Sequence, residues 1–198
     1  MSSETEPSNP NLSERERFSQ LTDVSMRLEL LQERKAHQAA LLARPPEAFF
    51  DEEDRLHALS YVELDIHGAA RNFAESVSLA NLGGALGYGE AADLLRANDI
   101  NVEAEPAEAY QDLLESLTPG AVINFYPFYA NRRETATIID ASTLYLHADT
   151  ASRDAVARAA IMIPIRYNDE IVDHEIFYPR RSRRSRPGEM IVPGLELA

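Results

Sequence analysis

The chain has 198 residues, a formal net charge of −14 and no cysteine. This length allows one domain with appendages or at most two small domains, and the lack of cysteine excludes disulfides, cysteine-bound zinc, iron–sulfur clusters and thiol nucleophiles. The sequence contains no run of about 18 apolar residues, so no segment is expected to span a membrane. No cofactor is expected. The acidic, polar N-terminus does not resemble a secretory signal, so we expect a cytoplasmic protein or one in a particle assembled in the cytoplasm.

The first predicted element after a tail is a long helix. Residues 1–12 are rich in Ser, Glu, Pro and Asn and are expected to be disordered. Ser13 with Glu16 three residues later has the pattern of a capping box, which opens a helix. Two consecutive prolines follow Arg44 and stop it, so the predicted helix covers 13–44.

This helix carries a narrow apolar stripe with alternating three- and four-residue spacing. Its members are Leu21, Val24, Leu28 and Leu31. The stripe is too short to establish a coiled coil, which needs three or four heptads. Two alternatives remain open: the helix lies on its own domain, or it pairs with another chain.

Residues 47–178 are predicted to form an α+β domain. Helices are expected at 69–82, 90–98 and 107–117, whereas residues 59–67 alternate in polarity. Their alternation fits a half-buried strand, but the helix formers before them also fit the early part of a longer helix.

The second half of the domain is rich in β-branched and aromatic residues, which favour strands. Strands are expected at 122–129, 137–139, 144–146, 161–165 and 171–178, with a short helix at 154–160. The Asn168-Asp169 pair predicts a hairpin turn, and Pro164 predicts a sheet edge or a bulge. We therefore expect an α+β fold, with a helical N-terminal half and an antiparallel or mixed sheet in the C-terminal half.

Residues 179–198 combine a basic segment with an apolar one. The arginines are Arg180, Arg181, Arg183, Arg184 and Arg186. They are followed by five apolar residues, among which Ile191 and Leu195 are candidate anchors. The pattern indicates a basic hinge that leads to an apolar arm, docked on its own domain or on a neighbour.

Histidines and carboxylates are the candidates for metal binding or acid–base catalysis. His67 follows Glu63 and Asp65, and His147 precedes Asp149. Such groups form a metal site or an acid–base pair if the fold brings them together. Neither histidine has the local spacing of a known metal motif.

Three functions follow, and the sequence favours the first. It is a non-enzymatic assembly or adaptor subunit of a homo-oligomer or larger complex, for example a capsid, connector or tail component of a virion. The second is a nucleic-acid-associated protein that holds phosphate with the arginine cluster. The third is an enzyme that depends on His67, His147 or a metal.

Overall fold

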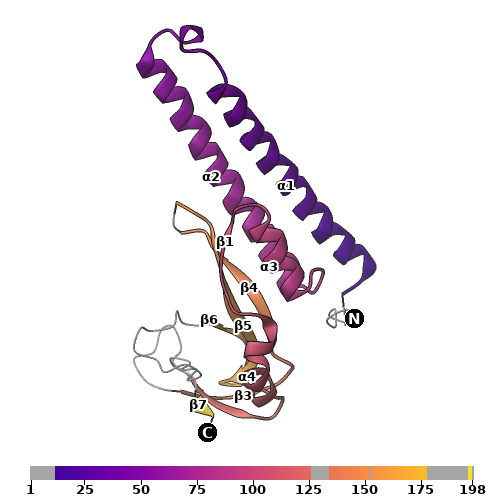
Figure 1. Ribbon diagram of the computed structural model, residues 1–198. Coiled ribbons are helices and arrows are strands. Elements are labelled where there is room, and N and C mark those ends of the chain that lie inside the picture. The colour runs from indigo at the N-terminus through magenta and orange to yellow at the C-terminus, as the bar shows by residue number, and fades with distance from the viewer. Residues whose placement is uncertain (1–11, 126–133, 152, 178–195, 198) are drawn as a thin grey trace. The chain divides into compact units, whose positions relative to one another are not determined.

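The computed structural model describes residues 12–125, 134–151, 153–177 and 196–197, which adopt the expected α+β fold (Figure 1). The chain divides into two compact units. The helical unit comprises Met1–Val102 and His147–Ala157, and the sheet unit comprises Glu103–Leu146 and Arg158–Ala198.

Four α-helices and seven strands lie in the described residues. The helices are α1 (Glu14–Leu42), α2 (Glu52–Leu82), α3 (Tyr88–Arg96) and α4 (Gln111–Ser116), with short 3-10 turns at Pro46–Ala48 and Ala107–Tyr110. The strands are β1 (Asn101–Glu103), β2 (Val122–Phe125), β3 (Glu134–Ile138), β4 (Thr143–Asp149), β5 (Val156–Tyr167), β6 (Glu170–Phe177) and β7 (Glu196–Leu197). None of the described helices is long and apolar enough to cross a bilayer.

Helix α1 begins with the predicted capping box. The Glu16 N–H donates to Ser13 Oγ at 3.2 Å, and the Ser13 N–H donates to Glu16 Oε2 at 3.1 Å. The hydrogen bonds from the Ser13 side chain and backbone lower the pKa of Glu16. Both partners satisfy backbone groups that an open helix end would leave unpaired.

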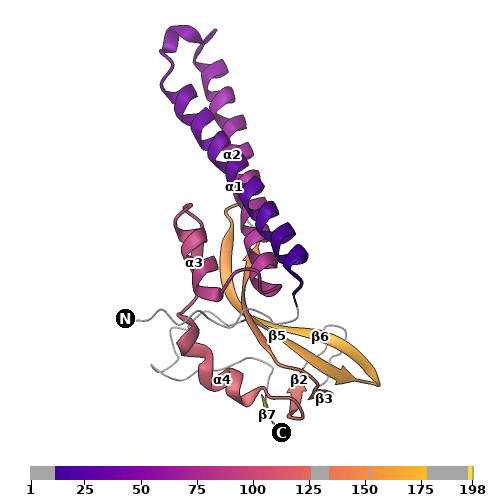
Figure 2. The same cartoon turned by 90° about the vertical axis from the view of Figure 1, so that its right-hand side faces the viewer.

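Helices α1 and α2 form a long antiparallel hairpin (Figures 1 and 2). Residues 59–67 belong to α2, so the strand alternative for this stretch is wrong. Buried α2 side chains recur at three- and four-residue intervals, as expected for a helix with one buried face. They include Val62, Ala69, Phe73, Val77 and Ala80. On α1 the buried side chains are Val24, Leu31 and Leu41.

The core of the sheet unit packs around β5. Its members are Leu117, Ile123, Ala136, Ile138, Ile161, Ile163, Ile165 and Ile176. Along β5 every second residue from Ala157 to Ile165 is buried, which is the period of a strand. The predicted short helix at 154–160 is therefore wrong, because β5 begins at Val156.

The predicted hairpin turn at Asn168-Asp169 joins β5 to β6. Tyr167 pairs with Glu170, and the two residues between them have φ values of 51° and 65°. Two consecutive positive φ values are what a type I′ turn requires, and its twist matches that of the strands.

Replacing Asp169 by glycine is expected to stabilise the protein by about 0.5–1 kcal/mol, since a positive φ is unfavourable for a residue with a Cβ. The matched control is Asp173→Gly, in the paired part of β6, where glycine is expected to destabilise by a similar amount. Urea denaturation of the two variants measures both effects. Equal destabilisation by both changes would contradict the turn geometry.

Pro164 lies inside the sheet rather than at its edge. Strand β5 pairs with β3 on one side and with β6 on the other, and its register with β6 is continuous. The Ile139 N–H donates to the Pro164 carbonyl at 2.9 Å, just past the end of β3. The missing proline N–H therefore falls where the ladder with β3 ends, which explains why proline is tolerated.

Strand β7 returns the end of the chain to the sheet. It pairs antiparallel with β2, with Ile123 opposite Leu197 and Asn124 opposite Glu196. The segment between Phe177 and Glu196 therefore has a strand of the same sheet at each end. The apolar arm was expected to dock either on its own domain or on a neighbour. Residues 196–197 of the arm pair with their own domain.

Candidate functional site

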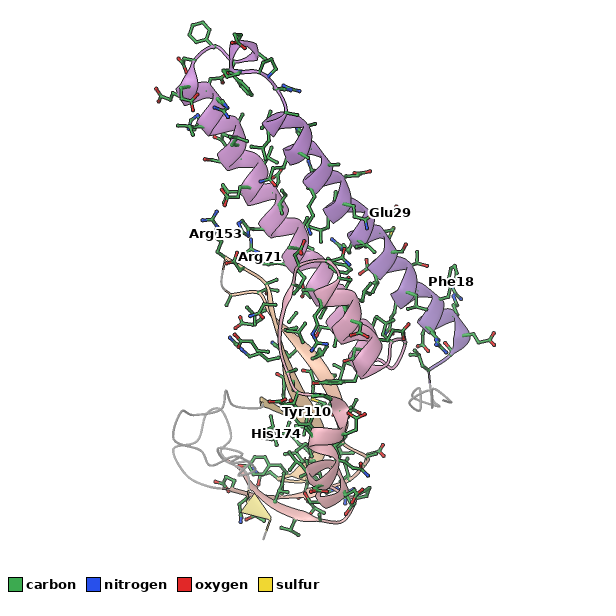
Figure 3. All side chains as sticks on the ribbon, viewed as in Figure 1. Phe18, Glu29, Arg71, Tyr110, Arg153 and His174 are labelled. Atoms are coloured by element: carbon green, nitrogen blue, oxygen red, sulfur yellow. The ribbon has the colours of Figure 1, made fainter. Side chains whose placement is uncertain are left out.

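A polar cluster joins α2 to the loop between β4 and β5 within the helical unit. His67 on α2 lies between Arg153 and Asp154 of the loop, and Arg153 also pairs with Glu63 one turn earlier on α2. Figure 3 labels Arg153, which lies beside α2. The Arg153 Nε–H donates to His67 Nε2 at 3.1 Å, and His67 Nδ1 lies 3.1 Å from Asp154 Oδ1. The cluster fastens the loop to the helix.

The contacts of His67 define what this imidazole can do. With its proton on Nδ1, the neutral ring donates to Asp154 and accepts from Arg153. A general base must offer its ring lone pair to a substrate proton. Here the Nε2 lone pair is held by a guanidinium, so the arrangement supports a structural role rather than proton transfer.

Among the described residues, His67 and His147 belong to no group of three side chains suited to a metal. His147 lies half-buried on β4. Across the described ranges, no three His, Asp or Glu side chains are grouped so that they could hold a metal ion. A metal-dependent function for His67 or His147 thus has no support from the described part of the chain.

Two neighbouring residues of β6 have pKa values shifted by burial. Burial lowers the pKa of His174 below its usual 6.5 and raises the pKa of Glu175 above its usual 4.5. Both shifts favour the neutral form. They act on stability in different pH windows.

Replacing Glu175 by glutamine is expected to stabilise the protein at pH 7 by less than about 1 kcal/mol, because the carboxyl is partly solvated. The folded carboxyl binds its proton more tightly than the unfolded one, so its burial costs nothing below pH 4.5 and its full amount above the raised pKa. Urea midpoints between pH 4 and 8 measure the difference. A gain that persists unchanged at pH 4 would exclude ionisation as its cause.

For His174 the opposite dependence of stability on pH is expected. The unfolded imidazole takes up its proton at a higher pH than the folded one, so stability falls as pH drops below about 6.5. In His174→Gln this part of the loss should be absent. An acid profile identical to that of the original chain would contradict the assignment.

Most of the exposed large apolar side chains of the described residues lie on the helical hairpin. Of eleven such exposed residues in the described chain, eight lie on α1, α2 or the connection between them. They are Phe18, Met26, Leu42, Phe50, Leu56, Tyr61, Leu64 and Leu79. Such residues are normal when scattered singly, whereas a contiguous exposed apolar patch marks a contact surface.

The connection between the two helices concentrates both apolar and acidic groups. We call residues 42–56 the hairpin tip. Leu42 and Leu56 are each more than half exposed, and Phe50 is 95 % exposed. The tip also carries five carboxylates between its two arginines, Arg44 and Arg55, and no cation between them. These are Glu47, Asp51, Glu52, Glu53 and Asp54.

Two of these carboxylates accept hydrogen bonds from the backbone near the start of α2. Asp51 Oδ1 accepts from the Asp54 N–H at 2.8 Å, and Asp54 Oδ2 accepts from the Phe50 N–H at 3.3 Å. Both therefore hold the start of α2. Glu52 lies 3.4 Å from Arg55, whereas Glu47 and Glu53 make no hydrogen bond or ion pair with the described residues.

The predicted interaction residues lie in different places. Val24 and Leu31 are buried in the hairpin, and Leu21 and Leu28 are half-buried. The arginine cluster (Arg180, Arg181, Arg183, Arg184 and Arg186), Ile191 and Leu195 lie outside the described residues. The predicted interaction residues do not include the tip, although Phe49-Phe50 followed by four acidic residues marks it in the sequence.

An open hollow of about 420 Å³ lies at the other end of the hairpin, between α1 and α2. Gln20 lines it, and its Oε1 is buried without a hydrogen-bond partner among the described residues. Gly83 permits this packing, because an added Cβ would lie 2.5 Å from Gln20 Nε2. The hollow is large enough for a water molecule, which would satisfy this oxygen.

Comparison of the chain with models of protein families, with curated proteins and with solved structures found no match.

Proposed function

We propose that this protein is a non-enzymatic assembly or adaptor subunit that acts within a homo-oligomer or a larger protein complex. The setting we propose is the cytoplasm or a particle assembled there, such as a virion. The observation that carries the proposal is the set of eight large apolar side chains exposed on the helical hairpin.

Exposure of apolar surface to water is unfavourable in free energy, and this cost supports the proposal. Full burial of a large apolar side chain is worth about 1.5–3 kcal/mol relative to exposure. The hairpin leaves eight such side chains in water while the same helices bury a continuous stripe on their facing sides. An element with one face buried by its own chain and further apolar groups outside is suited to contact a second protein.

Light scattering of the purified chain over a hundred-fold range of concentration tests the proposal. We expect the mean mass to rise with concentration toward a defined oligomer. A mass that stays at that of one chain throughout would exclude self-assembly.

A second candidate function rests on the five arginines between residues 180 and 186. Each phosphate that they neutralise adds about 0.9 to the slope of log affinity against log salt. A nucleic-acid-binding role would therefore show steep salt dependence, and deletion of residues 180–186 would abolish binding. Binding that survives this deletion would remove the candidate.

A further inference from the structure

We propose that the hairpin tip of one copy docks the arginine segment, residues 180–186, of a second copy. This inference rests on the proposed assembly function, and it names the contact through which copies associate. The starting observation is that the tip carries three large apolar side chains, Leu42, Phe50 and Leu56, which the described chain leaves more than half exposed.

The charge of the tip selects the kind of partner. Residues 45–54 carry five negative charges and no positive one, and residues 180–186 carry five positive charges and no negative one. Like charge across a contact costs several kcal/mol, whereas opposite charge steers and orients association. A tip-to-tip contact between copies would therefore repel, and an arginine-rich segment is favoured.

The chemistry of the tip suits arginine in particular. A guanidinium forms paired hydrogen bonds to a carboxylate in a fixed fork geometry, and it also stacks on the face of an aromatic ring. Glu47 and Glu53 have no partner among the described residues, and the Phe50 ring is almost fully exposed beside them in the chain. The tip therefore offers both of the groups that arginine binds best.

The length of the arginine segment allows it to extend from its own sheet. It begins three residues after Phe177 and ends ten residues before Glu196, and these two residues belong to β6 and β7. An extended chain spans at most about 3.6 Å per residue. Arg180 can thus lie at most about 11 Å from Phe177, and Arg186 at most about 32 Å, so the length of the chain does not prevent the segment from contacting another molecule.

The test is a charge exchange between two variants. The tip variant is Glu47→Lys, Glu52→Lys and Glu53→Lys, which leaves Asp51 and Asp54 to hold the start of α2. The arginine variant replaces all five arginines of the segment by glutamate. Sedimentation equilibrium measures the dissociation constant of each variant and of their equimolar mixture.

We expect each variant alone to associate at least about ten-fold more weakly than the original chain. Their mixture should recover association to within about three-fold, because the unaltered tip of the arginine variant meets the unaltered segment of the tip variant, and the reversed tip meets the reversed segment. Phe50→Ala should weaken association by about three-fold through loss of the ring contact. The matched control is Glu29→Lys, Glu33→Lys and Glu75→Lys, which reverses three exposed charges elsewhere on the same helices and should leave association unchanged.

The outcomes separate this inference from the proposed function. A chain that never associates overturns both. A chain that associates, but whose tip variant behaves like the control, overturns the tip as the docking surface while assembly stands. Weakening without recovery in the mixture overturns the arginine segment as the occupant. Unchanged self-association of the arginine variant, with loss of binding to duplex DNA, assigns the segment to nucleic acid instead.

Discussion

Replacing Phe73 by alanine is expected to lower the free energy of unfolding by about 3–5 kcal/mol. Phe73 is completely buried in α2, on the same face as Ala69 and Val77. Small neighbours cannot expand to fill the volume of a lost ring, so the change combines the lost transfer energy with the cost of a cavity. Urea denaturation followed by the helical circular dichroism signal measures the effect.

Phe50→Ala is the matched control for this prediction, because it removes the same ring from the exposed tip of the same hairpin. We expect a stability change within about 0.5 kcal/mol, as for surface substitutions in general. A loss comparable with that of Phe73→Ala would mean that the hairpin buries its faces differently from the structure described above.

The second large effect is expected in the sheet unit, where Ile163→Ala should cost about 2–5 kcal/mol. Ile163 is fully buried and lies at the centre of β5, opposite His174 of β6. Its methyl groups pack in the core cluster that α4, β2, β3, β5 and β6 border. Thermal and urea unfolding of the variant give the loss directly.

Ile171→Ala supplies the comparison, since Ile171 is 67 % exposed on the neighbouring strand β6. It also pairs with β5, opposite Arg166, so both variants alter the same ladder. We expect a change below about 1 kcal/mol for Ile171→Ala. Equal losses would show that pairing within the ladder, rather than burial, sets the stability of this sheet.

Short sequence motifs are enough to predict a helix start or a turn that depends on the side chains of a few adjacent residues. The capping box at Ser13 and Glu16 and the turn at Asn168-Asp169 each depend on a few adjacent residues, and both were predicted correctly. The α+β class followed from the change in composition along the chain, and it is also confirmed. These features need no knowledge of distant contacts.

The two wrong predictions of secondary structure concern segments in which the period of the buried residues is hard to recognise, either because alanines occupy buried positions or because the segment considered is short. From residue 155 onward, β5 buries alternate positions, but several are alanines, which also favour helices. In residues 59–67 a short alternation suggested a strand, although the helical spacing becomes evident only when Val62 is read with Ala69 and Phe73. A longer window would have distinguished the two periods.

Lys35, four residues after Leu31 at the end of the α1 stripe, has tertiary partners that no local pattern reveals. The Lys35 ammonium binds the Asn98 carbonyl at 3.1 Å and the Asp99 carboxylate at 2.8 Å, just after α3. This contact lowers the pKa of Asp99 through hydrogen bonding and charge attraction. The exposure of Phe50 at the tip likewise cannot be read from a local pattern, because it is a property of the folded hairpin.

The pairing of β7 with β2 has a consequence for the order in which the chain folds during synthesis. Contacts between α1 and α2 join neighbouring elements of the chain, and local contacts form quickly. One edge of β2, in contrast, must wait for residues 196–197, which follow all the other described strands in the chain. The helical hairpin can therefore form while the chain is still emerging, whereas this edge of β2 stays open until residues 196–197 have been synthesised.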